Sequence, residues 1–159
     1  MNIPKTTLTD GSPVTPDHRE LKPNGQQKGY VVLSAEERAK GFVRPVRQRY
    51  VHVGAPPRHP LRDLTPEEHE RYDRFSYAKF EQDPAHPTDG GLGRYWTEAE
   101  LRLSKGCGAA TTMGASLAET YARDPFFYSG TFCSTCRVRR PVGDAGEFVW
   151  DGTDKKVGT

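Results

Sequence analysis

The sequence predicts a small single domain of the α+β class, with short antiparallel strands, three to four short helices and an extended N-terminal arm. The length of 159 residues is that of one domain. Only 34% of the residues are hydrophobic, and 16 Gly and 13 Pro indicate a small core with many turns. We place the domain at residues 29–152, the arm at residues 1–28 and a polar tail at residues 153–159.

The N-terminal arm is defined by its composition. Residues 1–28 are rich in Pro, Thr, Gly and Asp, and their aliphatic side chains are isolated from one another. A segment of this kind has no apolar face to bury. We therefore expect it to be disordered alone or to lie along a partner.

Three helices are marked by Ser or Thr followed three residues later by Glu. In this capping box the hydroxyl accepts a hydrogen bond from the amide of the Glu, whose carboxylate reaches back to the capping amide. The motif occurs at 34–37, 65–68 and 97–100. We expect helices from these positions to about Lys40, Gln82 and Ser104.

A fourth helix and the strands follow from hydrophobic periodicity. Met113, Leu117 and Tyr121 recur at four-residue steps, which predicts a helix capped by Thr111 or Thr112. Runs of apolar residues bounded by turn residues predict strands. These runs are 29–33, 42–53 with its clearest part at 50–53, 126–132 and 147–150.

The three cysteines suggest a metal site. Cys107 lies between two glycines, and Cys133 and Cys136 form a C-x-x-C pair. Structural zinc sites use four Cys or His ligands, and Ser104 stands where a second pair would have its first cysteine. A fourth ligand must therefore come from elsewhere in the chain.

Five histidines can supply the fourth ligand. We choose His52 first, because a strand would hold it rigidly, and His59 second. The predicted zinc-ribbon-like site is thus Cys107, Cys133, Cys136 and His52, with Zn²⁺ in a structural role. Free buried thiols and a redox pair remain the alternatives.

Residues 106–136 (GCGAATTMGASLAETYARDPFFYSGTFCSTC) and 147–159 (EFVWDGTDKKVGT) resemble small proteins encoded by tailed bacteriophages and prophages that carry a zinc-ribbon-like cysteine site. That family has no established activity. The resemblance implies a viral gene product in the bacterial host cytoplasm or in the virion. An apolar export leader is not visible at the N-terminus, so we expect no secretion.

The leading functional hypothesis is non-enzymatic binding of proteins, either as an accessory structural component of the virion or as a host-directed effector. We expect no catalytic residue, no small-molecule substrate and no membrane segment, since apolar runs are far shorter than the ~20 residues that span a bilayer. A zinc hydrolase or deaminase is a weaker alternative. His18 and Glu20 match its H-x-E motif, but Phe132 replaces the Pro of its P-C-x-x-C motif, and the two motifs lie far apart in the chain.

The main alternative is a zinc-ribbon protein that binds nucleic acid. Two basic stretches could form a positive surface beside aromatic side chains. Their residues are Arg44, Arg47, Arg49, Arg137, Arg139 and Arg140. A formal net charge of only +2 favours the simpler interpretation of solvated strand faces.

Overall fold

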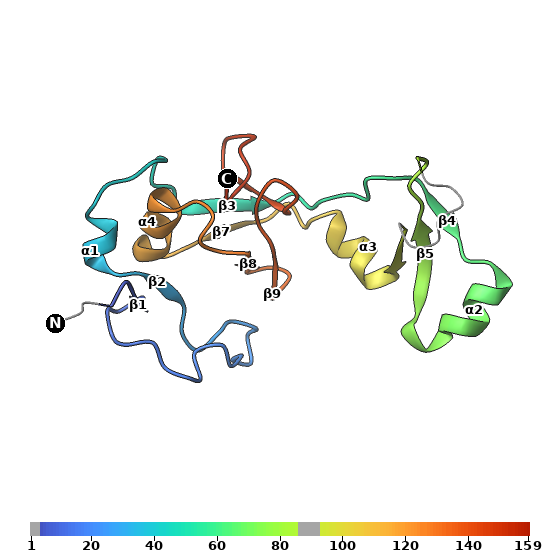
Figure 1. Cartoon of the computed structure of the whole chain (residues 1–159), viewed down its shortest axis with the longest axis horizontal. Helices are drawn as coiled ribbons and strands as arrows, with labels where there is room; N and C mark the ends of the chain where they lie inside the picture. The colour runs from blue at the N-terminus through green and yellow to red at the C-terminus, as the bar shows by residue number, and fades with distance from the viewer. Residues whose placement is uncertain (1–3, 86–92) are drawn as a thin grey trace. The chain divides into compact units, whose positions relative to one another are not determined.

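The computed structural model describes residues 4–85 and 93–159 (Figure 1). Within these ranges the fold is mixed α/β, with four α-helices and short strands that all pair antiparallel. The chain divides into two compact units rather than the expected single domain at 29–152. Unit 1 comprises Met1–Val53 and Cys107–Thr159, and unit 2 is the intervening Gly54–Gly106.

Unit 1 is built on a three-stranded sheet in which β3 (Arg49–His52) lies between β10 (Phe148–Trp150) and β7 (Ala110–Thr112). Unit 1 also contains two further antiparallel pairs. One pairs β1 (Thr6–Leu8) with β2 (Val31–Leu33), and the other is the hairpin of β8 (Gly130–Cys133) and β9 (Val138–Pro141).

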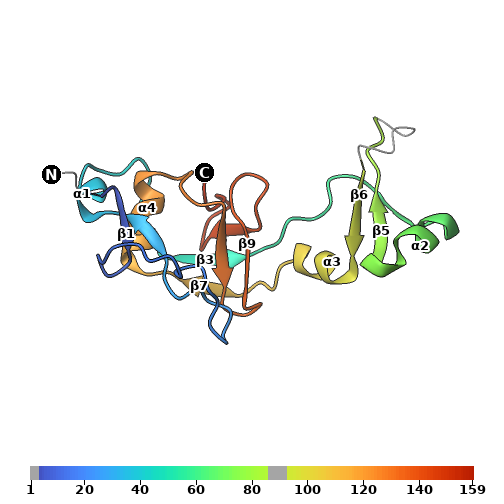
Figure 2. The same cartoon turned by 60° about the horizontal axis from the view of Figure 1, so that its bottom comes forward.

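Two helices complete unit 1. Figure 2 shows α4 (Ala115–Arg123) next to α1 (Ala35–Arg38) and β2. The contact includes an ion pair of 3.1 Å between Arg38 Nη1 and Glu119 Oε1. The Thr120 hydroxyl also accepts a hydrogen bond from the amide of Leu33, at 3.2 Å. These contacts join α4 to the β1–β2 pair.

The core of unit 1 lies between its central sheet and α4. It is small, as the composition suggested, and it is rich in aromatic residues. Its buried members are Tyr50, Met113, Ala118, Tyr121, Cys133, Phe148 and Val157. Val157 is fully buried and donates its amide to the carbonyl of Phe148, at 3.1 Å. Residues 153–159, expected to be a polar tail, therefore contribute to the core.

Residues 4–28, expected to form an extended arm, are folded into unit 1. Besides β1, they include a turn in which Lys22 donates its amide to the carbonyl of Gln26, at 2.7 Å. Gly25 has a φ of +89°, and a Cβ there would lie 2.2 Å from the carbonyl oxygen of Arg137. The turn thus packs directly on the β8–β9 hairpin, which sequence patterns could not show.

Unit 2 contains a three-stranded sheet in the order β4 (Leu61–Asp63), β5 (Tyr77–Glu81) and β6 (Arg94–Thr97). Its helices are α2 (Pro66–Tyr72) and α3 (Glu98–Ser104), and a 3₁₀ turn spans Asp73–Phe75. Phe80 and Trp96 are buried in this unit. Unit 2 therefore has a sheet and apolar contacts of its own, which explains the two-unit organisation.

The predicted helix from Thr65 to about Gln82 is wrong in its second half. The helix ends at Tyr72, Ser76 adopts a left-handed conformation with φ 57°, and the chain continues as β5. Tertiary contacts explain the change. The Phe80 ring packs 4.7 Å from that of Tyr95, and Glu81 Oε1 accepts a hydrogen bond of 2.8 Å from Trp96 Nε1.

The predicted helix starts are confirmed at Ser34, Thr65 and Thr97, whose hydroxyls each accept a hydrogen bond from the amide three residues later. The predicted cap of the fourth helix is wrong, because Gly114 caps α4, and Thr111 and Thr112 belong to β7. The strand expected at 126–132 begins only at Gly130. Among the described residues, no helix has the length and apolar character needed to cross a bilayer.

Candidate metal centre

The pairing of β3 with β7 brings His52 next to Cys107. His52 is the last residue of β3, and Cys107 lies just before β7. The amide of His52 donates to the carbonyl of Ala109 at 3.1 Å, and the amide of Gly108 donates to the carbonyl of His52 at 2.9 Å. Two residues on either side of unit 2 in the sequence are thereby fixed at adjacent positions.

The other two cysteines lie on the β8–β9 hairpin. Cys133 ends β8, and Cys136 is in the turn, where its amide lies 3.4 Å from Cys133 Sγ. Arg137 donates its amide to the carbonyl of Cys133 at 2.8 Å and has a left-handed φ of 56°. Arg137 occupies the position where zinc knuckles commonly have glycine, and it adopts the backbone conformation that glycine favours.

These four side chains converge. The Nδ1 or Nε2 atom of His52 and the three Sγ atoms all lie within 4.8 Å of one another. Cys107 Sγ is 3.5 Å from Cys133 Sγ, and Cys136 Sγ is 3.5 Å from His52 Nδ1. Zinc at ~2.3 Å from sulfur and ~2.0 Å from nitrogen would set tetrahedral ligand atoms about 3.5 to 3.8 Å apart. The group can therefore hold a metal ion.

The orientation of His52 leaves Nδ1 available for the metal. Its Nε2 lies 2.9 Å from Glu147 Oε1, and both side chains are buried. The imidazole also stacks on the Phe148 ring, with centroids 4.9 Å apart. An Nε2–H donated to the carboxylate fixes the tautomer in which Nδ1 has a lone pair facing the thiols, 3.4 Å from the amide of Cys107.

Glu147 is itself held in place by Arg140. Arg140 Nη2 lies 2.7 Å from Glu147 Oε2, and its Nε donates to the same oxygen at 2.9 Å. The Glu147 side chain is only 4% exposed, so this pairing also compensates a buried charge. A continuous chain of hydrogen bonds thus runs from Arg140 through Glu147 to the candidate ligand His52.

The thiols of Cys107 and Cys136 differ in pKa. Burial raises the pKa of Cys107, but a hydrogen bond from the Ala109 amide, followed by the contacts with His52 and the other two thiols, outweighs it and lowers the pKa to about 7. Burial, followed by the contacts with Cys133 and Cys107, raises the pKa of Cys136 to about 12. Three thiolates this close repel one another, so a divalent cation between them would favour their ionisation.

The structure brings together all four residues that the sequence analysis chose. His59, the second choice for the fourth ligand, belongs to unit 2. Ser104 is not part of the cluster, since its hydroxyl donates to the carbonyl of Leu101 at 2.6 Å. His18 Nδ1 lies 2.7 Å from the carbonyl of Thr15, and neither His18 nor Glu20 belongs to the metal group.

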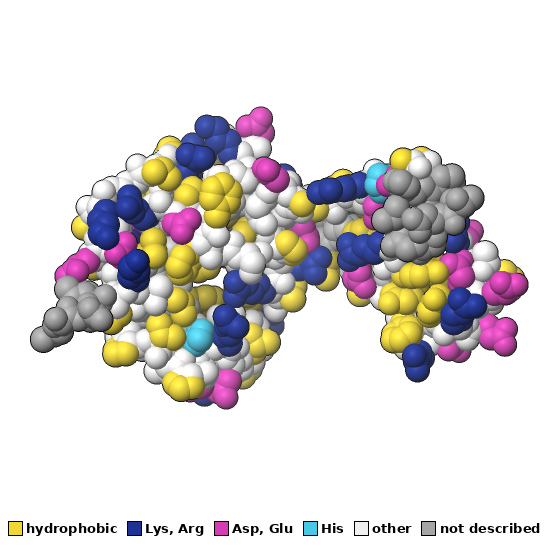
Figure 3. Space-filling view, viewed as in Figure 1, with side chains coloured by type: hydrophobic (Ala, Val, Ile, Leu, Met, Phe, Trp, Pro, Cys, Tyr) yellow, Lys and Arg dark blue, Asp and Glu magenta, His cyan; other side chains and the backbone are white. Residues whose placement is uncertain are grey.

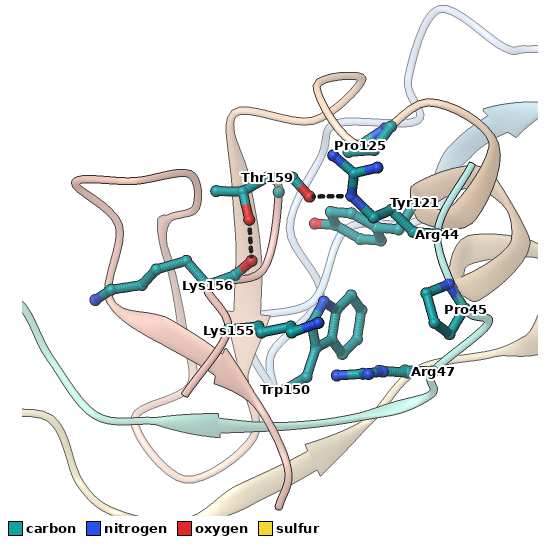
Figure 4. Close-up of a pocket in the computed structure, with 10 residues that line it drawn as sticks. Arg44, Pro45, Arg47, Tyr121, Pro125, Trp150, Lys155, Lys156 and Thr159 are labelled. Carbon is teal, nitrogen blue, oxygen red and sulfur yellow. Dashed lines mark hydrogen bonds between the residues drawn. The ribbon is translucent and has the colours of Figure 1, made fainter. Parts of the chain in front are cut away.

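The six predicted nucleic-acid residues have different environments. Arg44 and Arg47 line a pocket beside Trp150 (Figure 4). Arg49 forms an ion pair with Asp151 at 3.1 Å, and Arg140 forms one with Glu147 at 2.7 Å. Arg137 and Arg139 are exposed. On the face drawn in Figure 3, basic side chains are interspersed with acidic and apolar ones.

Sequence reasoning missed Glu147 and Arg140. Glu147 directly precedes β10, and its place beside His52 depends on the register in which Phe148 lies opposite His52. Arg140 appeared in the sequence only as one member of a basic stretch. An acidic residue at the start of the predicted strand 147–150 was the only available signal, and it does not identify its partner.

Comparisons of the chain with protein-family models, curated proteins and solved structures find no match. The functional argument therefore depends on the geometry of the chain itself.

Proposed function

We propose that this chain is a non-enzymatic, protein-binding protein whose unit 1 is stabilised by one structural zinc ion bound to Cys107, Cys133, Cys136 and His52. The observation that carries the proposal is the convergence of three thiols and one imidazole nitrogen within 4.8 Å. Soft sulfur ligands with one imidazole match the donors of structural zinc sites.

A structural role follows from the number and placement of the ligands. Four protein ligands complete a tetrahedron and leave no position for a reactive water. The ligands come from β3, the segment before β7 and the β8–β9 hairpin, so one ion would cross-link three parts of unit 1. The free energy of zinc binding then contributes directly to folding, which suits the small core.

The proposed partner is a protein, and unit 2 offers a suitable surface. Phe75, 45% exposed, stacks on Tyr77 with centroids 5.6 Å apart, and Tyr77 stacks on Tyr95 at 5.1 Å. The Arg74 guanidinium lies 4.7 Å from the centroid of the Phe75 ring. Aromatic residues and Arg are enriched at protein interfaces and among their strongest contributors. A virion subunit or a host protein is the class of partner that the phage resemblance implies.

Metal analysis of the purified chain tests the zinc site. We expect about one zinc per chain, lost in Cys133→Ser and in His52→Ala but retained in the matched variant His59→Ala. A wild-type chain purified under zinc-replete conditions without bound zinc would disprove the site. If zinc were lost in His59→Ala but retained in His52→Ala, the fourth ligand would be His59 and not His52.

Site-specific crosslinking in host cells tests the protein-binding surface. A photoreactive side chain at Phe75 should yield a discrete crosslinked protein, whereas one at Val46, equally exposed at 45% but in unit 1, should not. The identified partner should then bind the Phe75→Ala variant at least about tenfold more weakly than the Val46→Ala variant, the loss typical of a strong interface residue. Equal affinities would contradict the assignment.

A further inference from the structure

Unit 1 has a pocket that the metal centre and the surface around Phe75 do not use. Its volume is about 230 Å³. Figure 4 shows side chains from four parts of unit 1 around it: the segment before β3, α4 with the turn after it, β10 and the last residues of the chain. The lining residues are Arg44, Pro45, Arg47, Tyr121, Pro125, Trp150, Lys155, Lys156, Gly158 and Thr159.

The charge of this pocket is one-sided. Four of the ten lining residues are Lys or Arg, and none is Asp or Glu. Arg44 Nε donates to the carbonyl oxygen of Thr159 at 3.2 Å, and Lys156 Nζ donates to that of Gly146 at 2.9 Å. These two cations therefore each have a main-chain oxygen as partner, and no Asp or Glu side chain lines the pocket beside them.

The other two cations are less satisfied. Arg47 Nη1 is buried and has no hydrogen-bond partner among the described residues. No ion pair within the described ranges involves Arg47 or Lys155. A buried donor without a partner is unfavourable, so an anion that accepts its hydrogen bond would be stabilised.

The pocket also has an aromatic wall. The Trp150 indole lies between Arg47 and Lys155 in Figure 4 and is partly exposed. Its position is fixed by perpendicular packing on Tyr121, with centroids 5.6 Å apart, and on Tyr50, at 6.4 Å. A rigid indole beside cations without counterions is the combination that holds a planar base and its phosphate.

We propose that this pocket binds one nucleotide unit, with the base against Trp150 and the phosphate at Arg47 and Lys155. The volume is below the ~300 to 1,000 Å³ of sites for drug-sized ligands, which matches a single unit rather than a dinucleotide. A free mononucleotide and one residue of a single-stranded nucleic acid share this chemistry. The site is independent of the proposed protein-binding function.

Titrations with the zinc-loaded full chain test the proposal and distinguish the two sources. The probes are inorganic phosphate, uridine monophosphate and a fluorescein-labelled oligouridylate, with indole emission and fluorescence anisotropy as readouts. Stacking on Trp150 should quench part of the indole emission with uridine monophosphate or the oligonucleotide. Phosphate alone should bind more weakly and leave the emission unchanged. Binding of the oligonucleotide without the mononucleotide would assign the site to a strand; tight binding of both would assign it to the free nucleotide as well.

Charge-neutral variants locate the binding. Arg47→Gln and the exposed Lys155→Gln should each weaken binding about tenfold and lower the salt dependence by roughly one phosphate contact. Arg49→Gln is the matched control, because Arg49 is paired with Asp151 and does not line the pocket. Equal losses in all three variants, or no binding of either nucleotide probe to the wild type, would overturn the proposal. Phosphate binding as tightly as the nucleotides would overturn the role of Trp150.

Discussion

Glu147 Oε1 lies 2.9 Å from His52 Nε2, and the two side chains are 4% and 0% exposed. A buried carboxylate and imidazole in this arrangement fix which ring nitrogen carries the proton. The remaining nitrogen, Nδ1, faces Cys136 Sγ at 3.5 Å. The pair therefore has the geometry by which proteins orient a metal-ligating histidine. The candidate metal centre can accordingly be tested by replacing Glu147, which leaves all four candidate ligands in place.

Replacing Glu147 by Gln should weaken zinc binding without removing a ligand. The amide keeps the size of the carboxylate but loses the negative charge that Arg140 and the His52 N–H both contact. Residues that hydrogen-bond a metal-ligating histidine typically raise the metal affinity about 10-fold to 100-fold. We therefore expect the zinc affinity of Glu147→Gln to fall by about that factor in a chelator competition assay. Asp151→Asn, which removes the same charge from an exposed ion pair, should leave the affinity unchanged. Equal affinities of both variants and the wild type would show that Glu147 does not orient the ligand.

Removing zinc with a chelator should unfold unit 1 more than unit 2. All four candidate ligands belong to unit 1, whereas unit 2 has its own sheet and a buried Trp96. Peptide-resolved hydrogen exchange should show faster exchange in β3, β8 and β9 after chelation, while β5 and β6 stay protected. Added zinc should restore protection. A uniform change across the chain would indicate that the units are not independent, and no change at all would contradict the structural role of the metal.

Local chemistry made the helix starts and the candidate metal ligands predictable. A hydroxyl and a carboxylate three residues apart satisfy free amides wherever they occur, which is why the caps at Ser34, Thr65 and Thr97 could be identified. Three thiols in one chain likewise restrict the possible chemistry to a few types. His52 was chosen because a strand would hold it rigidly, and the β3–β7 pairing provides that rigidity.

Features that depend on non-local contacts could not be predicted. Glu147 reaches His52 only through the register of β10 on β3, which no residue pattern specifies. Residues 77–81 have a helix-compatible sequence but form β5, because they pair with β4 and β6 on both sides. The same applies to Val157, whose burial depends on a core made by distant strands.

Gly54 should be intolerant of a side chain. Its φ is +80°, and a Cβ would lie 2.2 Å from the carbonyl oxygen of Ser104, where the two ends of unit 2 meet. Gly152 has a similar φ of +77° but no atom within 4 Å of the added Cβ, so it measures the backbone strain alone. We expect Gly152→Ala to cost about 1 to 2 kcal/mol and Gly54→Ala clearly more, by urea unfolding. Equal losses of unfolding free energy in the two variants would show that the backbone at Ser104 can move away from the added Cβ without further destabilisation.

Unit 2 should lose stability in acid through Glu68. A hydrogen-bonded ion pair with Arg62, followed by hydrogen bonds from the Thr65 amide and the Tyr95 hydroxyl, outweighs burial and lowers the pKa of Glu68 from 4.5 to about 2. Because this pKa is lower in the folded than in the unfolded chain, the stabilisation is complete above about pH 4.5 and is lost as the pH falls toward 2. Glu68→Gln should therefore destabilise unit 2 at neutral pH by about 1 kcal/mol, a modest value because Arg62 is 39% exposed and screened by solvent.

The Trp96 indole, buried in unit 2, provides the readout for this prediction. Thermal unfolding followed by its fluorescence in a Trp150→Phe background should show a midpoint that falls between pH 4.5 and 2 in the parent chain. The fall should be smaller in the Glu68→Gln variant. Glu67→Gln, at an exposed position of α2, controls for the loss of one negative charge and should retain the full pH dependence. If Glu68→Gln and the parent chain lost stability in parallel over this range, another carboxyl group would be responsible, since a residue that cannot titrate has no proton to gain.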